Sequence, residues 1–182
     1  MNSTVIKTPE ALDHLNIPQI GVLPTVHDIK KGYHILQNFL EDSESNFSEA
    51  IRSSRAIIEA KFQKNKSYLI TSSNPSEGKT SFAFNLALSL EKNNKVLFIE
   101  ADIRRPSVLS KTNLSDEAPN IGFSDIIQGG DVKMSDCIMK LPGSEIEVMT
   151  SGTRRSDLTD LTTTKKLRQF FDILKNNYDY VI

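Results

Sequence analysis

The distribution of apolar positions predicts strands that alternate with helices. Short apolar runs predict strands over residues 68–71, 95–99, 146–149 and 178–182. Apolar residues at helical spacing predict helices from about Ser48 to Lys61, from Thr80 to about Lys92 and from about Thr163 to Asn176. Shorter helices are expected over 122–129 and around 134–139. This alternation is typical of a parallel sheet, so the fold class that we predict is α/β.

The strand over 95–99 ends on two carboxylates. Its unbroken apolar run is typical of a parallel strand covered on both faces. Glu100 and Asp102 follow directly, and because side chains alternate along a strand they are expected to point to the same side. Open α/β sheets bind ligands at this end of their strands, and magnesium is held by a few carboxylates together with phosphate oxygens and water. The pair therefore predicts a magnesium site, and a solvated loop entry is the alternative.

A phosphate-binding loop is predicted between the first strand and the helix that follows it. Residues 73–80 read SNPSEGKT, which is the pattern G-x-x-x-x-G-K-[ST] with Ser73 in place of the first glycine. Backbone N–H groups of such a loop hold phosphate oxygens, Lys79 can reach the β- and γ-phosphates, and the Thr80 hydroxyl suits magnesium. The tripeptide alone is weak evidence, but its place between a strand and a helix strengthens it. An ordinary strand–turn–helix is the alternative.

The N-terminal part of the chain predicts less structure. A short helix can begin at Thr8, residues 17–24 form an extended piece bracketed by prolines, and the acidic tract 41–44 is expected to be a solvated linker. On the helix that follows, Glu49, Arg52 and Arg55 are spaced three apart and so share one face. That face is either a row of salt bridges within the helix or an interface with another subunit.

Composition excludes several classes of protein. The 182 residues are 38% hydrophobic and 25% charged with a net charge of −1, which predicts one globular domain and no general nucleic-acid binder. The single cysteine, Cys137, excludes a disulfide framework and is expected to be a small hydrophobe at a partly buried site, in a reduced, cytosolic setting. The three histidines have no metal-binding spacing. No apolar run approaches the length of a membrane span.

The chain resembles the cytoplasmic ATP-binding domain of bacterial tyrosine kinases, autophosphorylating regulators of capsule and exopolysaccharide synthesis and export. Five segments carry the resemblance: 73–80, similar to the Walker A loop; 99–106, similar to the Walker A′ motif; 122–129, similar to the segment after it; 49–55, similar to the E-x-x-R-x-x-R oligomerisation motif; and 17–24, similar to the juxtamembrane segment. The implied fold is a P-loop NTPase-type parallel sheet flanked by helices.

The resemblance also implies ligands and residue roles. Magnesium and ATP are the expected cofactors, Lys79 and Asp102 the catalytic residues, and Thr80, Glu100 and Asp102 the metal ligands. Glu49, Arg52 and Arg55 would mediate oligomerisation. The nucleotide-binding residues implied by the resemblance are Ser73, Asn74, Ser76, Glu77, Gly78, Lys79, Thr80 and Ser81.

Two features depart from the family pattern. The family has aspartate where this chain has Glu100, and the extra methylene is expected to shift the metal or to require a bridging water. The sequence stops at Ile182, before the expected Walker B aspartate and before a C-terminal tyrosine cluster, so we predict a sheet truncated ahead of Walker B. Its tyrosines are Tyr33, Tyr68, Tyr178 and Tyr180.

The resulting prediction has two parts along the chain. Residues 1–46 are expected to be a juxtamembrane-like segment and linker, and residues 47–182 a kinase domain that lacks its C-terminal part. The expected partners are further copies of the chain, in a homo-oligomer such as a ring, and the membrane chain-length regulator of a polysaccharide export system, at the cytoplasmic face of the inner membrane. Two alternatives remain: a non-catalytic nucleotide-binding module, and an ATPase of the ParA/MinD type.

Overall fold

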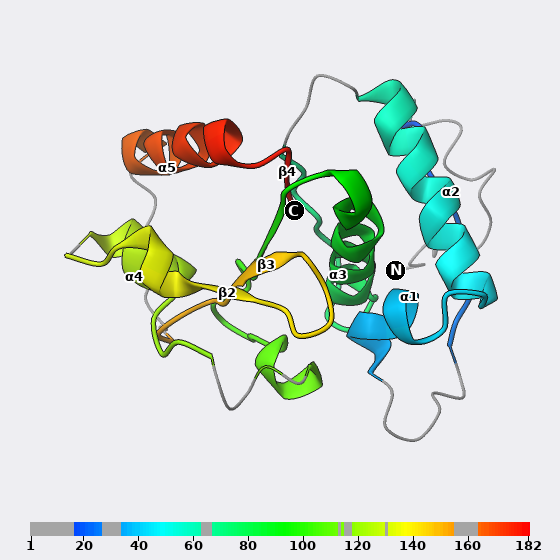
Figure 1. Ribbon diagram of the computed structural model, residues 1–182, viewed down its shortest axis with the longest axis horizontal. Helices are drawn as coiled ribbons and strands as arrows, with labels where there is room; N and C mark the ends of the chain where they lie inside the picture. Colours follow the sequence, from blue (N-terminus) through cyan, green and yellow to red (C-terminus); the bar gives the residue numbers. More distant parts are fainter. Residues whose placement is uncertain are drawn as a thin grey trace, which may run out of the picture.

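The fold is a sheet covered by helices on both faces, which confirms the predicted α/β class. The computed structural model describes residues 17–26, 34–62, 67–112, 114, 118–129, 131–154 and 164–182. The sheet has the order β2-β3-β1-β4 (Figure 1). Strand β1 (Val96–Ile99) pairs in parallel with β3 (Glu147–Met149) and with β4 (Tyr180–Val181), whereas β2 (Ile138–Lys140) runs antiparallel to β3.

Two layers of helices enclose this sheet. One layer holds η2 (Ile35–Gln37), α1 (Asn38–Glu41), α2 (Asn46–Lys61), α3 (Lys79–Leu90) and η3 (Glu91–Asn93). The other holds α4 (Phe123–Gln128) and α5 (Thr164–Asn177), which lie away from α3 in the view of Figure 1. The short helices η4 (Leu109–Lys111) and η5 (Met134–Cys137) lie in connections.

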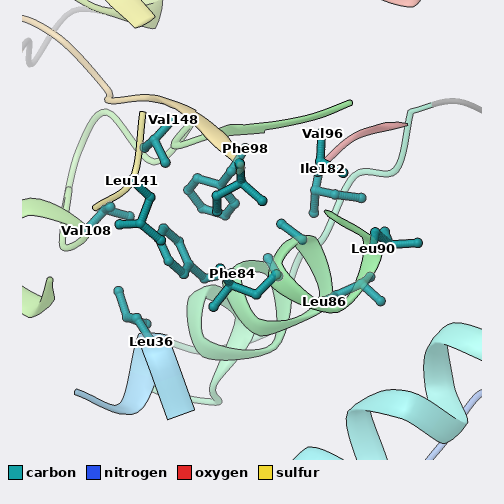
Figure 2. Packing of buried hydrophobic residues seen from close by; sticks show 14 of the residues in the cluster. Leu36, Phe84, Leu86, Leu90, Val96, Phe98, Val108, Leu141, Val148 and Ile182 are labelled. Carbon is teal, nitrogen blue, oxygen red and sulfur yellow. The ribbon is translucent and has the colours of Figure 1, made fainter. Parts of the chain in front are cut away.

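Strand β1 divides the apolar core between these layers. Its residues alternate, so Val96 and Phe98 join the cluster around α3 while Leu97 joins the cluster around α4 and α5. Phe98 meets Phe84 of α3 edge to face, with ring centroids 4.8 Å apart (Figure 2). Each fully buried side chain of this size contributes about 1.5–3 kcal/mol, so β1 fixes both layers and thereby the loops at its carboxyl end.

The residues just ahead of the acidic tract are packed, whereas Ser43 and Glu44 within the tract are exposed. Leu36 is 0% exposed and belongs to the α3 cluster. Asn85 of α3 accepts a hydrogen bond from Phe39 N at 2.8 Å and donates to the carbonyl oxygens of Ile35 at 2.9 Å and Ser81 at 2.8 Å. One buried amide therefore ties residues 35–39 to the first turns of α3. The domain boundary at residue 46 stays a prediction.

Most predicted elements are present, with ends displaced by one or two residues. Helix α2 begins at Asn46 because Ser45 caps it, its Oγ accepting a hydrogen bond from Ser48 N at 3.2 Å. Residues 17–24 have no regular secondary structure. The helix expected at Thr8 lies outside the described residues.

Two predictions of secondary structure are wrong. The expected strand over 68–71 is absent: the preceding residue, Ser67, makes one isolated parallel bridge to Val181, the last residue of β4, and residues 68–71 have no strand assignment. The expected helix around 134–139 stops at Cys137, and residues 138–140 instead form β2. A short apolar run between polar residues does not distinguish these two structures by periodicity.

The turn before α4 touches the loop after β3 through backbone atoms. A Cβ on Gly122 would lie 2.3 Å from the Thr150 carbonyl oxygen and 2.5 Å from Gly152 N. Asp125 Oδ2 accepts hydrogen bonds from Gly122 N and Thr153 N, both at 2.9 Å. Residues 150–153 are therefore held at the carboxyl end of β3, beside the end of β1.

Candidate nucleotide-binding site

A cavity of about 310 Å³ opens where β1 ends and α3 begins. Lys79 and Thr80, the last two residues of the predicted loop, meet both predicted carboxylates here because β1 and α3 pack on each other through Phe84 and Phe98. The lining residues are Tyr68, Leu69, Ile70, Thr71, Lys79, Thr80, Ala83, Phe98, Ile99, Glu100, Ala101, Asp102 and Ile182.

The loop over 73–78 has the backbone geometry of a phosphate-binding turn. Gly78 is the N-cap of α3 with φ of 86°, and Ser76 has φ of 65°, which is uncommon for a residue with a side chain. No side chain of the described residues caps the start of α3. The first N–H groups of this helix therefore remain available to an anion, which the helix dipole also favours.

Within the loop, Glu77 folds back onto Asn74. Its carboxylate accepts hydrogen bonds from Asn74 N and Asn74 Nδ2, both at 3.0 Å. These hydrogen bonds lower the pKa of the Glu77 carboxyl, first through the Asn74 side chain and then through its backbone. Two of the predicted binding residues thus brace the loop itself, and both are exposed.

Lys79 and Asp102 form an ion pair at the cavity. Lys79 Nζ lies 2.9 Å from Asp102 Oδ2, and Asp102 Oδ1 accepts a hydrogen bond from Arg105 N at 3.1 Å. Burial acts to raise the pKa of the Asp102 carboxyl, but the hydrogen bonds from Lys79 and Arg105 and their charges outweigh it and lower the pKa. Asp102 is therefore an ionised carboxylate that lines the same cavity as Thr80, and carboxylate and hydroxyl oxygens are the kind of ligand that magnesium takes.

Glu100 has a different environment. It is 4% exposed, and its Oε1 accepts hydrogen bonds from Ser107 N at 2.5 Å and Val108 N at 2.9 Å. Oε2 is buried and has no hydrogen-bond partner among the described residues. Burial raises the pKa of this carboxyl, although the two backbone N–H groups act against the rise. The described residues hold no cluster of three acidic, histidine or cysteine side chains at metal-binding distance.

The structure brings together only part of the residues that the sequence suggests. Lys79, Thr80, Glu100 and Asp102 line one cavity. The others lie in the loop or in the first turn of α3 without lining it: Ser73, Asn74, Ser76, Glu77, Gly78 and Ser81. Sequence reasoning missed the backbone N–H groups of Ser107 and Val108, because a backbone donor leaves no signal in residue type.

The Glu49, Arg52 and Arg55 face of α2 has partners within the chain. Arg52 pairs with Glu49 at 2.8 Å and donates to the Ser43 carbonyl oxygen at 2.8 Å. Arg55 donates to the carbonyl oxygen of Ser89 on α3 and lies 3.7 Å from the Glu59 carboxylate. These contacts leave Glu49 the most exposed of the three residues, and they do not test an interface between subunits.

Comparison with known proteins identifies the relatives of this chain. It is 29% identical to the putative tyrosine-protein kinase CapB of Staphylococcus aureus over 142 residues, which is 76% of this chain and 60% of CapB. It is also 29% identical to the tyrosine-protein kinase YwqD of Bacillus subtilis over 146 residues, covering 79% of this chain and 60% of YwqD. The chain therefore spans about three fifths of the length of these relatives. No family model matches it.

Solved structures show the same fold. The chimerical protein CapA2B2 superposes with a TM-score of 0.79 at 26% identity, covering 95% of this chain and 72% of that one. The kinase domain of the Escherichia coli tyrosine kinase ETK gives a TM-score of 0.80 at 24% identity, covering 96% of this chain and 71% of that one. Fold and site together define an α/β protein of the P-loop class. Within that class, the chain is similar to bacterial tyrosine kinases in sequence and in fold.

Proposed function

We propose that this chain is the ATP-binding domain of a tyrosine autokinase. The observation that carries the proposal is the meeting of Lys79 and Asp102, 2.9 Å apart, in a cavity at the uncapped start of α3. The similarity to tyrosine kinases supports the use of ATP. The cavity supplies what the phosphates of a nucleotide require, namely free backbone donors, a mobile ammonium group and oxygen donors for a cation.

The residues have separable roles in this proposal. The first N–H groups of α3 bind phosphate oxygens, and Lys79 turns from Asp102 toward the β- and γ-phosphates. Thr80 and Asp102 would hold magnesium, which when bound neutralises charge on the phosphates. Asp102, ionised and at the cavity, is placed to accept the proton of an attacking tyrosine hydroxyl.

The acceptor tyrosine is proposed to belong to a neighbouring subunit and to be none of the three tyrosines that the structure describes. Of the tyrosines that the structure describes, Tyr178 is buried and donates a hydrogen bond to Glu147, and Tyr68 donates to the Phe62 carbonyl oxygen at 3.2 Å. Tyr180 stacks against Tyr68 with ring centroids 6.3 Å apart. All three are packed side chains. The same observation favours the second candidate, a module that binds nucleotide and assembles without transferring phosphate.

Partners and location belong to this proposal as well. The similarity to bacterial tyrosine kinases supports self-association through the α2 face. It also supports contact with a membrane regulator of polysaccharide export and a place at the cytoplasmic face of the membrane. Among the helices that the structure describes, none has both the length and the hydrophobicity of a membrane span.

The proposal is tested by measuring nucleotide affinity and phosphotyrosine in one set of proteins. Lys79→Ala should weaken magnesium–ATP binding about tenfold or more, because a charge-assisted contact contributes about 1.5–3 kcal/mol. Lys92→Ala, in η3 just beyond the far end of α3 and exposed, is the matched control and should bind like the wild type. Phosphotyrosine in the wild type after incubation with magnesium–ATP supports the kinase. Binding without phosphotyrosine supports the module, and no binding by the wild type contradicts both.

A further inference from the structure

The Glu100 carboxylate faces a loop rather than the phosphate-binding turn. Its backbone N–H donates to the Met149 carbonyl oxygen at 2.9 Å, which fixes the residue at the sheet edge. Its Oε1 then spans to the backbone N–H groups of Ser107 and Val108, at 2.5 and 2.9 Å. Buried backbone donors need an acceptor, and this carboxylate is the one that they have.

Two carboxylates hold the loop over 102–108, each by accepting hydrogen bonds from a different part of its backbone. It begins at Asp102, turns through buried Ile103, exposes Arg104, Arg105 and Pro106, and returns to the core at Val108. Asp102 Oδ1 holds its middle through Arg105 N at 3.1 Å, and Glu100 Oε1 holds its far end. Asp102 Oδ2 meanwhile faces Lys79. The orientation of Asp102 therefore depends on a loop that Glu100 anchors.

We propose that Glu100 is a positioning residue that closes the 102–108 loop and so orients Asp102 toward Lys79, instead of serving as a third metal ligand. The link to nucleotide binding rests on the proposed function, whereas the closing of the loop does not.

The length of the glutamate side chain is what this role requires. An aspartate at position 100 would withdraw the carboxylate by about one carbon–carbon bond, ~1.5 Å. Contacts of 2.5 and 2.9 Å would then exceed hydrogen-bonding distance. A glutamine keeps both the length and an acceptor oxygen for the backbone N–H groups of Ser107 and Val108, so it is the variant that preserves the anchor.

The two variants Glu100→Asp and Glu100→Gln separate anchoring from metal binding. An anchor tolerates glutamine and fails with aspartate, whereas a metal ligand tolerates aspartate and fails with glutamine. The first measurement is the rate of trypsin cleavage after Arg104 in the nucleotide-free protein, since Pro106 protects the bond after Arg105. We expect Glu100→Asp to be cut at least tenfold faster than the wild type, and Glu100→Gln within twofold of it.

The second measurement is the affinity of the two variants for magnesium–ATP. A role of Glu100 in stability alone would not make Glu100→Asp bind more weakly than Glu100→Gln. Glu100→Asp should bind several-fold more weakly, and Glu100→Gln should bind as the wild type does. Cleavage after Lys140, in β2, reports general unfolding and should stay constant, and the pair Glu147→Asp and Glu147→Gln controls for shortening or neutralising a glutamate elsewhere in the sheet.

Two results would overturn the inference. One is cleavage of Glu100→Asp after Arg104 at the wild-type rate. The other is loss of magnesium-dependent affinity in Glu100→Gln while Glu100→Asp retains it. If the wild type binds no nucleotide, the proposed function fails, and the cleavage rates still decide whether Glu100 closes the loop.

Discussion

Lys79 and Asp102 neutralise each other at the cavity, and the strength of that pairing decides whether the lysine can leave it. Both side chains keep about a third of their surface exposed, and exposed ion pairs contribute only about 0.2–1 kcal/mol. A nucleotide phosphate carries more charge than one carboxylate and can therefore compete for the ammonium group. The pair holds Lys79 near the phosphates without trapping it.

Cys137 allows a residue-scale measurement because it is the single cysteine of the chain. It is 0% exposed, and burial raises the pKa of its thiol to about 11. Alkylation by iodoacetamide at pH 8 should be at least 100-fold slower in the folded protein than in urea, since only the thiolate reacts.

The raised pKa of the Cys137 thiol also predicts how the free energy of unfolding changes with pH. Above pH 9 the unfolded thiol loses its proton while the folded one keeps it. The contribution of Cys137 is therefore fully present below that pH and is lost as the pH rises toward about 11. Urea unfolding at pH 8 and pH 10, compared with Cys137→Ala, measures this difference. Fast labelling in native buffer would contradict the buried position.

At the scale of elements, α2 combines an internal contact with an exposed edge. Arg55 reaches across to the Ser89 carbonyl oxygen of α3, whereas the Glu49 carboxylate pairs with Arg52 of its own helix. The helix can therefore pack on α3 through one residue of the motif and still present another to a neighbouring subunit.

This division predicts different costs for two substitutions on α2. Arg55→Ala should lower the free energy of unfolding by about 1–2 kcal/mol, because a charge-assisted hydrogen bond and packing against α3 are lost. Glu49→Ala should lower it by no more than about 0.5 kcal/mol. Urea denaturation measures both, and sedimentation of the same variants reports self-association. Equal stabilities for the two variants would show that the Arg55 contact with α3 contributes little.

Elements with strong periodicity were predictable from the sequence, and elements that depend on a partner were not. Helices α2, α3 and α5 carry their own apolar faces, and Ser45 caps α2. Residues 68–71 have strand propensity, but a strand forms only where a neighbouring strand offers hydrogen-bond partners. Here Val181 makes a single bridge, to Ser67, just ahead of these residues. Likewise the role of Glu100 depends on backbone donors at 107–108, which no pattern of residue types reveals. The loop at 73–80 was recognisable because its chemistry is local.

At the scale of the whole molecule, the described N-terminal residues 34–41 are part of the core. Asn85→Ala should release them, because Phe39 N and the Ile35 carbonyl oxygen both lose a partner. Hydrogen exchange at the Phe39 amide should accelerate at least tenfold. Ser89→Ala is the matched control, since the Ser89 hydroxyl bonds only within α3, to the Leu86 carbonyl oxygen at 2.7 Å. Unchanged exchange in Asn85→Ala would show that apolar packing alone holds the segment.

The three hydrogen bonds of Asn85 also define a route for mechanical tension. A pull on the chain ahead of His34 loads the backbone of residues 35–39 first. That backbone is held by the Asn85 amide, whose remaining bond ends on the Ser81 carbonyl oxygen, in the opening turn of α3. A single side chain, Asn85, thus connects residues 35–39 to the turn that is proposed to bind phosphate. Tension on residues 35–39 would therefore reach the proposed nucleotide site.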